Sequence, residues 1–469
     1  MSSLSDLEGL TRKLMKKGYS EEEIINRLVQ EYLDFKDNLD EITAKKYARA
    51  ILEECIKSDI DSVSESFVKE ILDFNKANVT IGKQGVGCRG AGDFFVHKLI
   101  TELSETEKKA YLSPSSLDDA GAIRLKDIKG FKGGHLDKDD LIIVSKMEGI
   151  HSRLSDFPFI CGFHVTRAAL RDLYVKGSKP VSIMVDAHLG DDADVGKLFD
   201  FMAGVSAISE LADVPITAGS TLRIGGDMVI GNRFVGGISA VGIAKERLLA
   251  RKNIKVGDKI LMTEGAGGGT ITTTAIYSGN HEAVLETINI KFLEACEILF
   301  ESAYLDEIRA MCDVTNGGLR GDLYEINYEA NCGVAIYENE VRKLVNPNIL
   351  KLLESVGVDY LGVSLDALLI YCSDTISEQI IADLAKKNIK CAEIGYVDDS
   401  KQISMIFQDK NKKDILPRFR ESAYTKIKQE IGEETPEAID VMHKKVETAA
   451  SEALLKRKKI LEYIREKTN

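Results

Sequence analysis

The sequence predicts an α/β (α+β) protein with two α/β domains, a small helical domain before them and a helix after them. From about residue 80 onward, short β-branched runs alternate with Gly-rich turns and helical patterns of about 10–15 residues. The same alternation begins again after Arg251, which indicates two halves of similar size. The chain of 469 residues has room for about three domains, and its 44% apolar residues can form their cores.

The composition excludes several classes of protein. The 75 acidic and 62 basic side chains leave a net charge of −13, which would repel nucleic acid and anionic lipid, so neither is expected as a partner. The chain lacks a run of about 18 apolar residues and the apolar core of a signal peptide, so we expect a cytoplasmic location. The eight cysteines form no CxxC pair, which argues against a zinc site or a disulfide framework.

Both ends of the chain are expected to be helical. Residues 1–75 carry capping pairs just ahead of apolar stripes of helical period. Residues 429–469 place Thr435 as N-cap and Pro436 at the first helical position, before a long apolar face. We interpret the N-terminal helices as a stability or dimerisation domain, with a regulatory or partner-binding role as the alternative. The capping pairs are Ser5 with Glu8, Ser20 with Glu23 and Ser62 with Glu65.

Residues 76–248 and 249–428 are expected to form the two α/β domains. Each contains β-branched or apolar runs of strand length bounded by turn residues. The expected strands are residues 141–144, 181–185, 228–230 and 237–243 in the first domain, and residues 259–262, 333–336, 367–371 and 402–407 in the second.

A glycine-rich segment, residues 82–93 (GKQGVGCRGAGD), follows a β-like run. Glycines let the backbone approach an anion closely, and Lys83 and Arg89 add positive charge. The pattern is neither a P-loop nor a dinucleotide fingerprint, and a plain mobile loop is the alternative interpretation. The glycines expected to contact phosphate are Gly85, Gly87 and Gly90.

Carboxylates recur at turns and at the ends of expected elements. Asp118 and Asp119 precede small residues, and Glu148 ends an expected strand. Asp172 falls in the last turn of an expected helix over residues 161–176, where the helix dipole disfavours an acid by a few tenths to about 1 kcal/mol. Hard oxygen ligands for Mg²⁺ are needed wherever a triphosphate is handled, which makes these acids metal-ligand candidates.

The segment 313–323 (DVTNGGLRGDL) combines an acid, a hydroxyl and an amide ahead of two glycines that open a helix. The positive end of such a helix can hold phosphate while Asp313 holds a metal ion. The candidates for contact with the nucleotide are Thr315, Asn316, Gly317 and Gly318.

Two other segments are candidates for contact with a nucleotide or an anion. Small and hydroxylic residues follow an apolar strand at residues 216–221, where a nucleotide could approach the backbone. Residues 264–270 (EGAGGGT) form either a second anion-binding loop or a hinge. In the first of these segments the binding candidates are Thr217, Gly219, Ser220 and Thr221.

The order of these motifs resembles the PurM-like superfamily of ATP-binding proteins, which contains aminoimidazole ribonucleotide (AIR) synthase, selenophosphate synthetase, thiamine monophosphate kinase and a hydrogenase maturation factor. Residues 313–319 resemble its Asp-x-Thr-x-Gly-Gly-Leu signature in the second domain. Residues 118–120 resemble its Asp-Asp-Ala motif, and residues 172–180 resemble its Asp-(Leu/Ile)-x-x-x-Gly-x-x-Pro helix end. The resemblance covers residues 80–410 and leaves both helical ends outside.

The resemblance implies a two-domain protein whose first domains pair across a homodimer into a shared β-barrel, with ATP in the cleft. It assigns metal ions to Asp118, Asp119, Asp172 and Asp313, and it implies that the glycine-rich loop closes over the phosphates. Selenophosphate synthetase has a reactive Cys or selenocysteine and a nearby Lys in that loop. Cys88 is therefore a candidate for a reactive residue, or else a small loop residue without a chemical part.

The chain departs from the family pattern at three places. Arg89 directly follows Cys88, and the family Lys is missing unless Lys83 replaces it. Glu148 stands where most relatives carry Asp. Arg171 stands where relatives commonly carry Asn or Ser. Its guanidinium either occupies space that relatives use to bind metal or nucleotide, or pairs with a phosphate group.

The leading hypothesis is an enzyme that uses ATP and Mg²⁺ to phosphorylate a small-molecule acceptor. Such catalysis requires positioning and charge neutralisation, for which Lys83, Cys88 and Arg89 are the catalytic candidates and Asp118, Asp119, Glu148, Asp172 and Asp313 the metal-ligand candidates. The alternative is a nucleotide-binding regulator or assembly factor that has kept the fold and lost turnover. His151 and His188 are weaker candidates for proton transfer.

Overall fold

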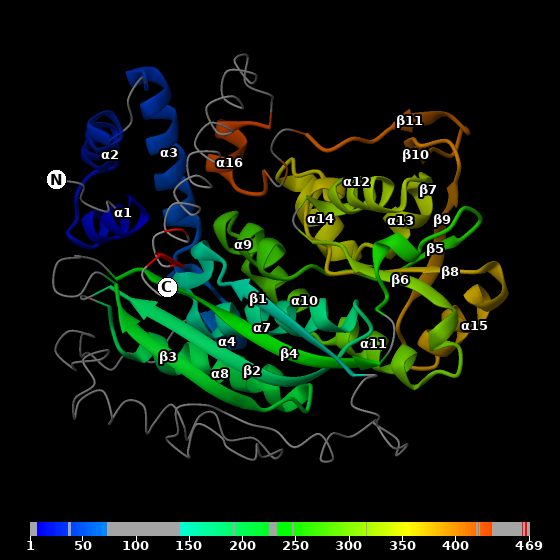
Figure 1. The fold of residues 1–469 in the computed structure, drawn as a ribbon. Helices are drawn as coiled ribbons and strands as arrows, with labels where there is room; N and C mark the ends of the chain where they lie inside the picture. Colours follow the sequence, from blue (N-terminus) through cyan, green and yellow to red (C-terminus); the bar gives the residue numbers. More distant parts are fainter. Residues whose placement is uncertain are drawn as a thin grey trace.

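The computed structural model describes residues 7–35, 39–72, 141–190, 193–224, 232–245, 248–315, 317–418, 421, 423–433, 462 and 465–466. Figure 1 shows the N-terminal helices in blue, a four-stranded sheet in cyan to green, and a seven-stranded sheet with its helices in green to orange. The predicted mixed α/β class with a helical N-terminal region is confirmed. The domain boundaries proposed after residues 75, 248 and 428 remain predictions.

Of the three predicted capping pairs, Ser20 with Glu23 is confirmed and Ser5 lies outside the described residues. Ser62 was wrongly predicted as a cap, because it ends η1 and Glu65 accepts from Val68 N at the start of α4. Ser20 N donates a hydrogen bond to Glu23 Oε2 at 2.8 Å, and Glu23 N donates to Ser20 Oγ at 3.4 Å, which is the capping box expected from the sequence. The sequence analysis did not identify α3, whose N-cap Asp40 accepts from Thr43 N. The helices and the short 3₁₀ turn are α1 (Leu7–Lys16), α2 (Glu21–Phe35), α3 (Glu41–Lys57), η1 (Ile60–Ser62) and α4 (Ser66–Leu72).

The first sheet has the strand order β1-β4-β2-β3 within the described residues, and β2 and β3 are its parallel pair. Residues 217–221 were expected to follow a strand, but they are themselves part of β3. Pairing with β2 explains the difference, because β-branched Ile and Thr fit a strand once a partner is available. The elements are β1 (Leu141–Gly149), η5 (Ser152–Asp156), α7 (Pro158–Tyr174), β2 (Lys179–Leu189), α8 (Gly196–Leu211), β3 (Ile216–Arg223) and β4 (Phe234–Lys245).

Helices α7 and α8 pack closely against each other beside this sheet. The contact depends on Gly162 and Gly204, because a Cβ at either position would overlap a backbone carbonyl of the other helix. This close packing sets the position of α7, which carries Arg167, Arg171 and Asp172.

The second sheet has the order β11-β10-β7-β9-β5-β8-β6 within the described residues. Strand β8, which lies between β5 and β6, is apolar and fully buried, as expected for a strand covered on both faces. The strands are β5 (Lys259–Thr263), β6 (Ile308–Asp313), β7 (Gly333–Tyr337), β8 (Leu368–Cys372), β9 (Cys391–Asp398), β10 (Ile403–Ile406) and β11 (Lys412–Asp414). The helices are η7 (Arg251–Asn253), α9 (Gly269–Tyr277), η8 (His281–Ala283), α10 (Val284–Thr287), α11 (Lys291–Glu301), η9 (Leu305–Glu307), α12 (Gly318–Ala330), α13 (Glu338–Leu344), α14 (Pro347–Ser355), η10 (Tyr360–Gly362), α15 (Asp374–Ala385) and α16 (Lys426–Ile431).

Buried charges join the N-terminal helices to the rest of the chain. Arg153 lies 3.0 Å from Glu8 and also contacts Glu54. Tyr277, at the end of α9, donates its hydroxyl hydrogen to Glu8 Oε2 at 2.9 Å, and Ile427 N of α16 donates to Glu54 Oε1 at 2.7 Å. The N-terminal helices therefore hold one end of α9 and support α16, which Figure 1 places above α9.

Several predictions concern residues outside the described part of the chain. These are the glycine-rich segment 82–93, Asp118 and Asp119, the strand at 228–230 and the helix beginning at Thr435. Seven of the eight cysteines are described, and all seven are unpaired thiols. Among the described helices, none combines the length and the apolar character needed to span a bilayer.

Candidate functional site

A polar cavity of about 510 Å³ opens where the two sheets and their helices meet. Strand β1 and helix α7 form one wall, and the N-terminus of α9, the end of β6 and the segment before β8 form the other. Its charged and hydroxylic lining includes Lys146, Glu148, Arg171, Asp172, Asp313 and Thr315. The cavity therefore collects acids and cations from both halves of the chain.

Local structure explains how the acids reach this place. Lys146 and Glu148 lie two residues apart on β1 and so point to the same face of the sheet. Asp172 lies in the last turn of α7, as the sequence predicts, and Asp313 is the final residue of β6. The ends of a strand, a helix and a second strand thus meet around one point.

Cations of the chain lie against these acids. Lys146 Nζ is 2.6 Å from Asp172 Oδ2 and 3.1 Å from Glu148 Oε2. Arg171 Nε is 2.6 Å from Asp313 Oδ2 and 3.5 Å from Asp172 Oδ1. The departure from the family pattern at Arg171 therefore places a guanidinium among the acids expected to hold metal.

Asp366 joins two buried arginines of α7. Its Oδ1 accepts from Arg171 Nη1 at 2.6 Å, and its Oδ2 lies 2.5 Å from Arg167 Nη2. The terminal nitrogens of Arg167 also donate to the carbonyls of Gly267, Thr287 and Asn289. Helix α7 is thereby attached to the second half of the chain by charge-assisted hydrogen bonds, which are among the stronger contacts in proteins.

Burial and the neighbouring charges shift the pKa values of Asp313 and Asp172 in opposite directions. Burial raises the pKa of Asp313 to about 6, and Asp172 adds to that rise while Arg171 opposes it. Burial would also raise the pKa of Asp172, but Arg171 and Lys146 outweigh it, so the pKa of Asp172 lies below its ordinary value. Asp172 is thus the more firmly ionised member of the pair.

The fit of this site to Mg²⁺ rests on two buried carboxylate oxygens. Asp172 Oδ1 and Asp313 Oδ2 meet no aligned donor from another group within the described residues, although Arg171 Nε is close to both and the two carboxyls interact with each other. Carboxylate oxygens without a donor suit a hard divalent cation. No group of three or more potential metal ligands forms among the described residues. Asp172 and Asp313 therefore form only part of a metal site, and Asp118 and Asp119 would have to complete it.

One helix begins at this cavity and a second begins near it, and a helix N-terminus carries partial positive charge. Gly268, Gly269 and Thr270 line the cavity where α9 begins, at the segment expected to be an anion-binding loop or a hinge. Helix α12 begins beyond Thr315, after Gly317 and Gly318 with left-handed φ values of +93° and +58°. A Cβ at Gly318 would overlap Leu361 O, so both its conformation and its surroundings require glycine.

The cavity unites some of the predicted site residues and not others. Glu148, Asp172, Asp313 and Thr315 line it. The lining does not include Gly317 and Gly318, at the start of α12, nor Thr217, Gly219, Ser220 and Thr221, which lie on β3. Lys83, Gly85, Gly87, Cys88, Arg89, Gly90, Asp118, Asp119 and Asn316 lie outside the described residues.

Several charged or polar residues of the cavity were not predicted from the sequence, among them Lys146, His164, Arg167 and Asp366. The only local signal for Asp366 was a single acid between Leu365 and Ala367, just before a fully apolar strand. A charge in such a position is seldom buried without a partner. The sequence does not indicate which cationic side chain pairs with Asp366.

His151 lies at the edge of the cavity and contacts Tyr424, which lies just before α16. Its Nε2 is 2.6 Å from Tyr424 Oη, and its Nδ1 is 3.3 Å from Thr273 Oγ1. Burial lowers the pKa of His151 to about 4, and the nearby Lys428 and Arg153 add to the effect. His188, by contrast, lies on β2 against Asp186 and does not line the cavity.

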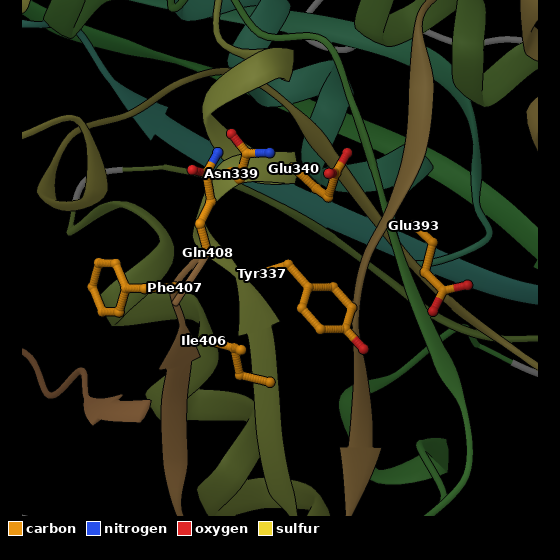
Figure 2. A pocket seen from close by; sticks show the side chains of 7 residues that line it. All are labelled: Tyr337, Asn339, Glu340, Glu393, Ile406, Phe407 and Gln408. Atoms are coloured by element: carbon orange, nitrogen blue, oxygen red, sulfur yellow. The ribbon is translucent and has the colours of Figure 1, made fainter. Parts of the chain in front are cut away.

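A second hollow of about 380 Å³ lies at strands β7, β9 and β10. Figure 2 shows the ring of Tyr337 between Ile406 and Glu393, with Asn339 and Glu340 of α13 beside it. None of the predicted site residues lines this hollow. The cavity between the two halves is therefore the candidate functional site.

Comparison with known proteins supports the resemblance inferred from the motifs. The family described as AIR synthase related protein, N-terminal domain, matches residues 117–244, and the corresponding C-terminal domain matches residues 255–408. An uncharacterized protein of Methanocaldococcus jannaschii is 45% identical over 468 residues, which cover 99% of each chain. A selenide, water dikinase of Pelobacter propionicus is 26% identical over 315 residues, which cover 59% of this chain and 82% of that one.

A solved structure shares the fold. The crystal structure of the hydrogenase maturation protein HypE in complex with ATP superposes with a TM-score of 0.56 at 17% identity, covering 71% of this chain and 96% of that one. At this identity the likeness shows the fold alone.

The bridge formed by Asp366 leads to a stability prediction. Asp366→Asn removes the charge shared by two buried guanidinium groups, and breaking a buried ion pair costs about 3–5 kcal/mol. We expect a loss of that size in the free energy of unfolding, measured by urea denaturation. Glu340→Gln is the control, because Glu340 contacts Lys343 at the surface and should cost about 0.5 kcal/mol or less. Equal losses in the free energy of unfolding for Asp366→Asn and Glu340→Gln would contradict the assignment of Asp366 to a buried ion pair.

His151 leads to a pH-dependence prediction. Its folded pKa of about 4 lies below the unfolded value of about 6.5, so the unfolded chain binds a proton first as the pH falls. Stability should therefore decline from about pH 6.5 to pH 4, with up to about 3 kcal/mol from this group. His151→Gln should reduce the slope in that window, measured by denaturation at a series of pH values. His188→Gln is the control, and equal slopes for wild type and His151→Gln would refute the prediction.

Proposed function

Because this chain belongs to the family of AIR synthase related proteins, we propose that it is an ATP- and Mg²⁺-dependent phosphoryl-transfer enzyme acting on a small-molecule acceptor. The superfamily contains ATP-using proteins, among them a HypE structure that holds ATP and relatives named selenide, water dikinase. Which small molecule accepts the phosphoryl group must be inferred from the residues of this chain.

The observation that carries the proposal is the convergence of acids, cations and the N-terminus of α9 in one cavity between the two halves. Its volume of about 510 Å³ falls in the range of about 300–1,000 Å³ typical of small-molecule sites. Phosphoryl transfer is catalysed chiefly by positioning and by neutralising charge, which this set of groups can supply. A purely structural cluster would have no need of an open cavity.

Asp172 and Asp313, together with Asp118 and Asp119, would hold Mg²⁺, and the metal ion would neutralise charge on the phosphate oxygens. The N-termini of α9 and α12 would meet the phosphates with their backbone N–H groups. Lys146 and Glu148 would orient the nucleotide from β1. The glycine-rich segment 82–93 would cover the phosphates, with Lys83, Cys88 and Arg89 as its catalytic candidates.

The contacts of Arg171 favour a second candidate function. Its guanidinium is matched by Asp172, Asp313 and Asp366, so the acids are already neutralised without metal. Such a site suits a nucleotide-binding regulator or assembly factor with weakened turnover. ATP hydrolysis measured across a Mg²⁺ titration separates the two, because only the enzyme should show metal-dependent turnover.

We also propose that the chain forms a homodimer through the open face of the first sheet. Ile143 and Met147 of β1 are 74% and 61% exposed, and Leu222 of β3 and Val235 of β4 are 47% and 39% exposed. Strand register places all four on the same face, since His188 lies opposite both Val235 and Leu222. An apolar face of this kind is typical of a protein interface, and the family resemblance implies a shared barrel there.

We also propose a cytoplasmic location, which the unpaired thiols of the seven described cysteines and the proposed use of ATP support.

The nucleotide proposal is tested by calorimetric titration of ATP with and without Mg²⁺. Wild type should bind ATP more tightly with Mg²⁺, and Asp313→Asn should lose at least about 10-fold in affinity because one metal ligand is removed. Asp186→Asn, on β2 outside the cavity, is the matched control. Absence of nucleotide binding by wild type would defeat both candidate functions, and metal-independent binding would favour the regulator.

The dimer proposal is tested by sedimentation equilibrium. Replacing Ile143 and Met147 together by Asp should weaken association at least about 10-fold, because two charges would be buried in an apolar interface. Val256→Asp is the control, since Val256 is 59% exposed and lies outside the first sheet. A monomeric wild type, or an unchanged dimer in the double variant, would refute the proposal.

A further inference from the structure

The end of the cavity over Gly268 contains a buried acceptor without a donor. His164 of α7 is 5% exposed and lines the cavity, yet its Nδ1 makes no hydrogen bond within the described residues. A Cβ built on Gly268 would lie 4.0 Å from His164 Nδ1 and 3.2 Å from Arg167 Nη2. The space at the start of α9 is therefore bounded by an imidazole nitrogen on one side and a guanidinium on the other.

Counting hydrogens assigns the tautomer of His164. Thr287 donates its hydroxyl hydrogen to Val284 O at 2.7 Å, so its oxygen must accept from Thr272 across the 2.8 Å contact between the two hydroxyls. Thr272 then has no hydrogen left for His164 Nε2, which lies 2.7 Å away and must itself donate. The proton sits on Nε2, and Nδ1 presents a lone pair.

The groups around Nδ1 decide what that lone pair can receive. Both terminal nitrogens of Arg167 are committed to Asp366 and to the carbonyls of Gly267, Thr287 and Asn289. Burial and the charge of Arg167 hold the pKa of His164 well below its ordinary value, so the imidazole is neutral. The positive end of α9 and the two arginines of α7 disfavour a cationic ligand here.

We propose that this end of the cavity binds an uncharged hydrogen-bond donor of the phosphoryl acceptor, a hydroxyl or an amide N–H, which donates its hydrogen to His164 Nδ1. The proposal rests on the proposed function and narrows its acceptor to a molecule that carries such a neutral donor. An ammonium group is repelled by the neighbouring positive charges, and a carboxylate has no hydrogen to offer a lone pair. His164 acts as a binding and specificity residue that stays neutral, and it takes no proton from the acceptor.

The first test uses glycerol as the hydroxyl probe and needs no nucleotide. In protein labelled with ¹⁵N-histidine, glycerol should shift the His164 Nδ1 resonance in the direction of an accepted hydrogen bond. Acetate and ethylammonium at the same concentration should leave it in place. A response to either ion instead of glycerol would overturn the proposal, as would an Nδ1 resonance already in the hydrogen-bonded range and unmoved by glycerol, which would mean a resident water.

A pair of substitutions separates binding from structure. His164→Asn places a carbonyl oxygen near the position of Nδ1, whereas His164→Gln places an amide N–H near Nε2 and keeps the contact with Thr272. In saturation-transfer NMR, His164→Asn should bind glycerol within about 3-fold of wild type, and His164→Gln should bind it about 10-fold more weakly or worse. The reverse order, or equal affinities, would show that His164 serves only the packing of α9. ATP calorimetry is independent of this result, so either proposal can fail without the other.

Discussion

The bridge from Asp366 to Arg167 and Arg171 is the interaction on which the site depends. It joins α7, which packs beside the first sheet, to the segment that precedes β8 in the second sheet. Charges buried this deeply persist only when paired, so the bridge fixes how the two halves face each other. The cavity, the position of Asp172 at the helix end and the space over Gly268 all follow from that arrangement.

The same bridge gives the cavity a balanced charge before any ligand arrives. Asp172 and Asp313 already lie against Lys146 and Arg171, so a metal ion or a phosphate group must exchange contacts with existing partners. Any affinity for a nucleotide is therefore a difference between two sets of pairs, as expected for charges in a low-dielectric interior. This balance is the physical basis for both an enzyme and a regulator as candidate functions.

The helical N-terminus is connected to the site through α9. The Glu8, Glu54 and Arg153 network holds the far end of that helix through Tyr277, while its near end borders the cavity at Gly268. The segment around α16 adds a second connection, because Tyr424, just before the helix, contacts His151, and Ile427 of α16 contacts Glu54. The N-terminal helices thus contribute to the shape of a cavity that they do not line.

Local patterns in the chain predict the alternation of strands and helices, the capping box at Ser20 and Glu23, and the positions of Glu148, Asp172 and Asp313 at the ends of elements. These features depend on local pattern and on motifs of a known superfamily. Pairing with β2 made residues 217–221 part of a strand. The roles of His164, Arg167 and Asp366 were decided by tertiary structure, because Arg171 and Asp366 are 195 residues apart in the chain. No local pattern encodes which buried acid pairs with which buried arginine, because the packing of α7 against the second half of the chain brings these residues together.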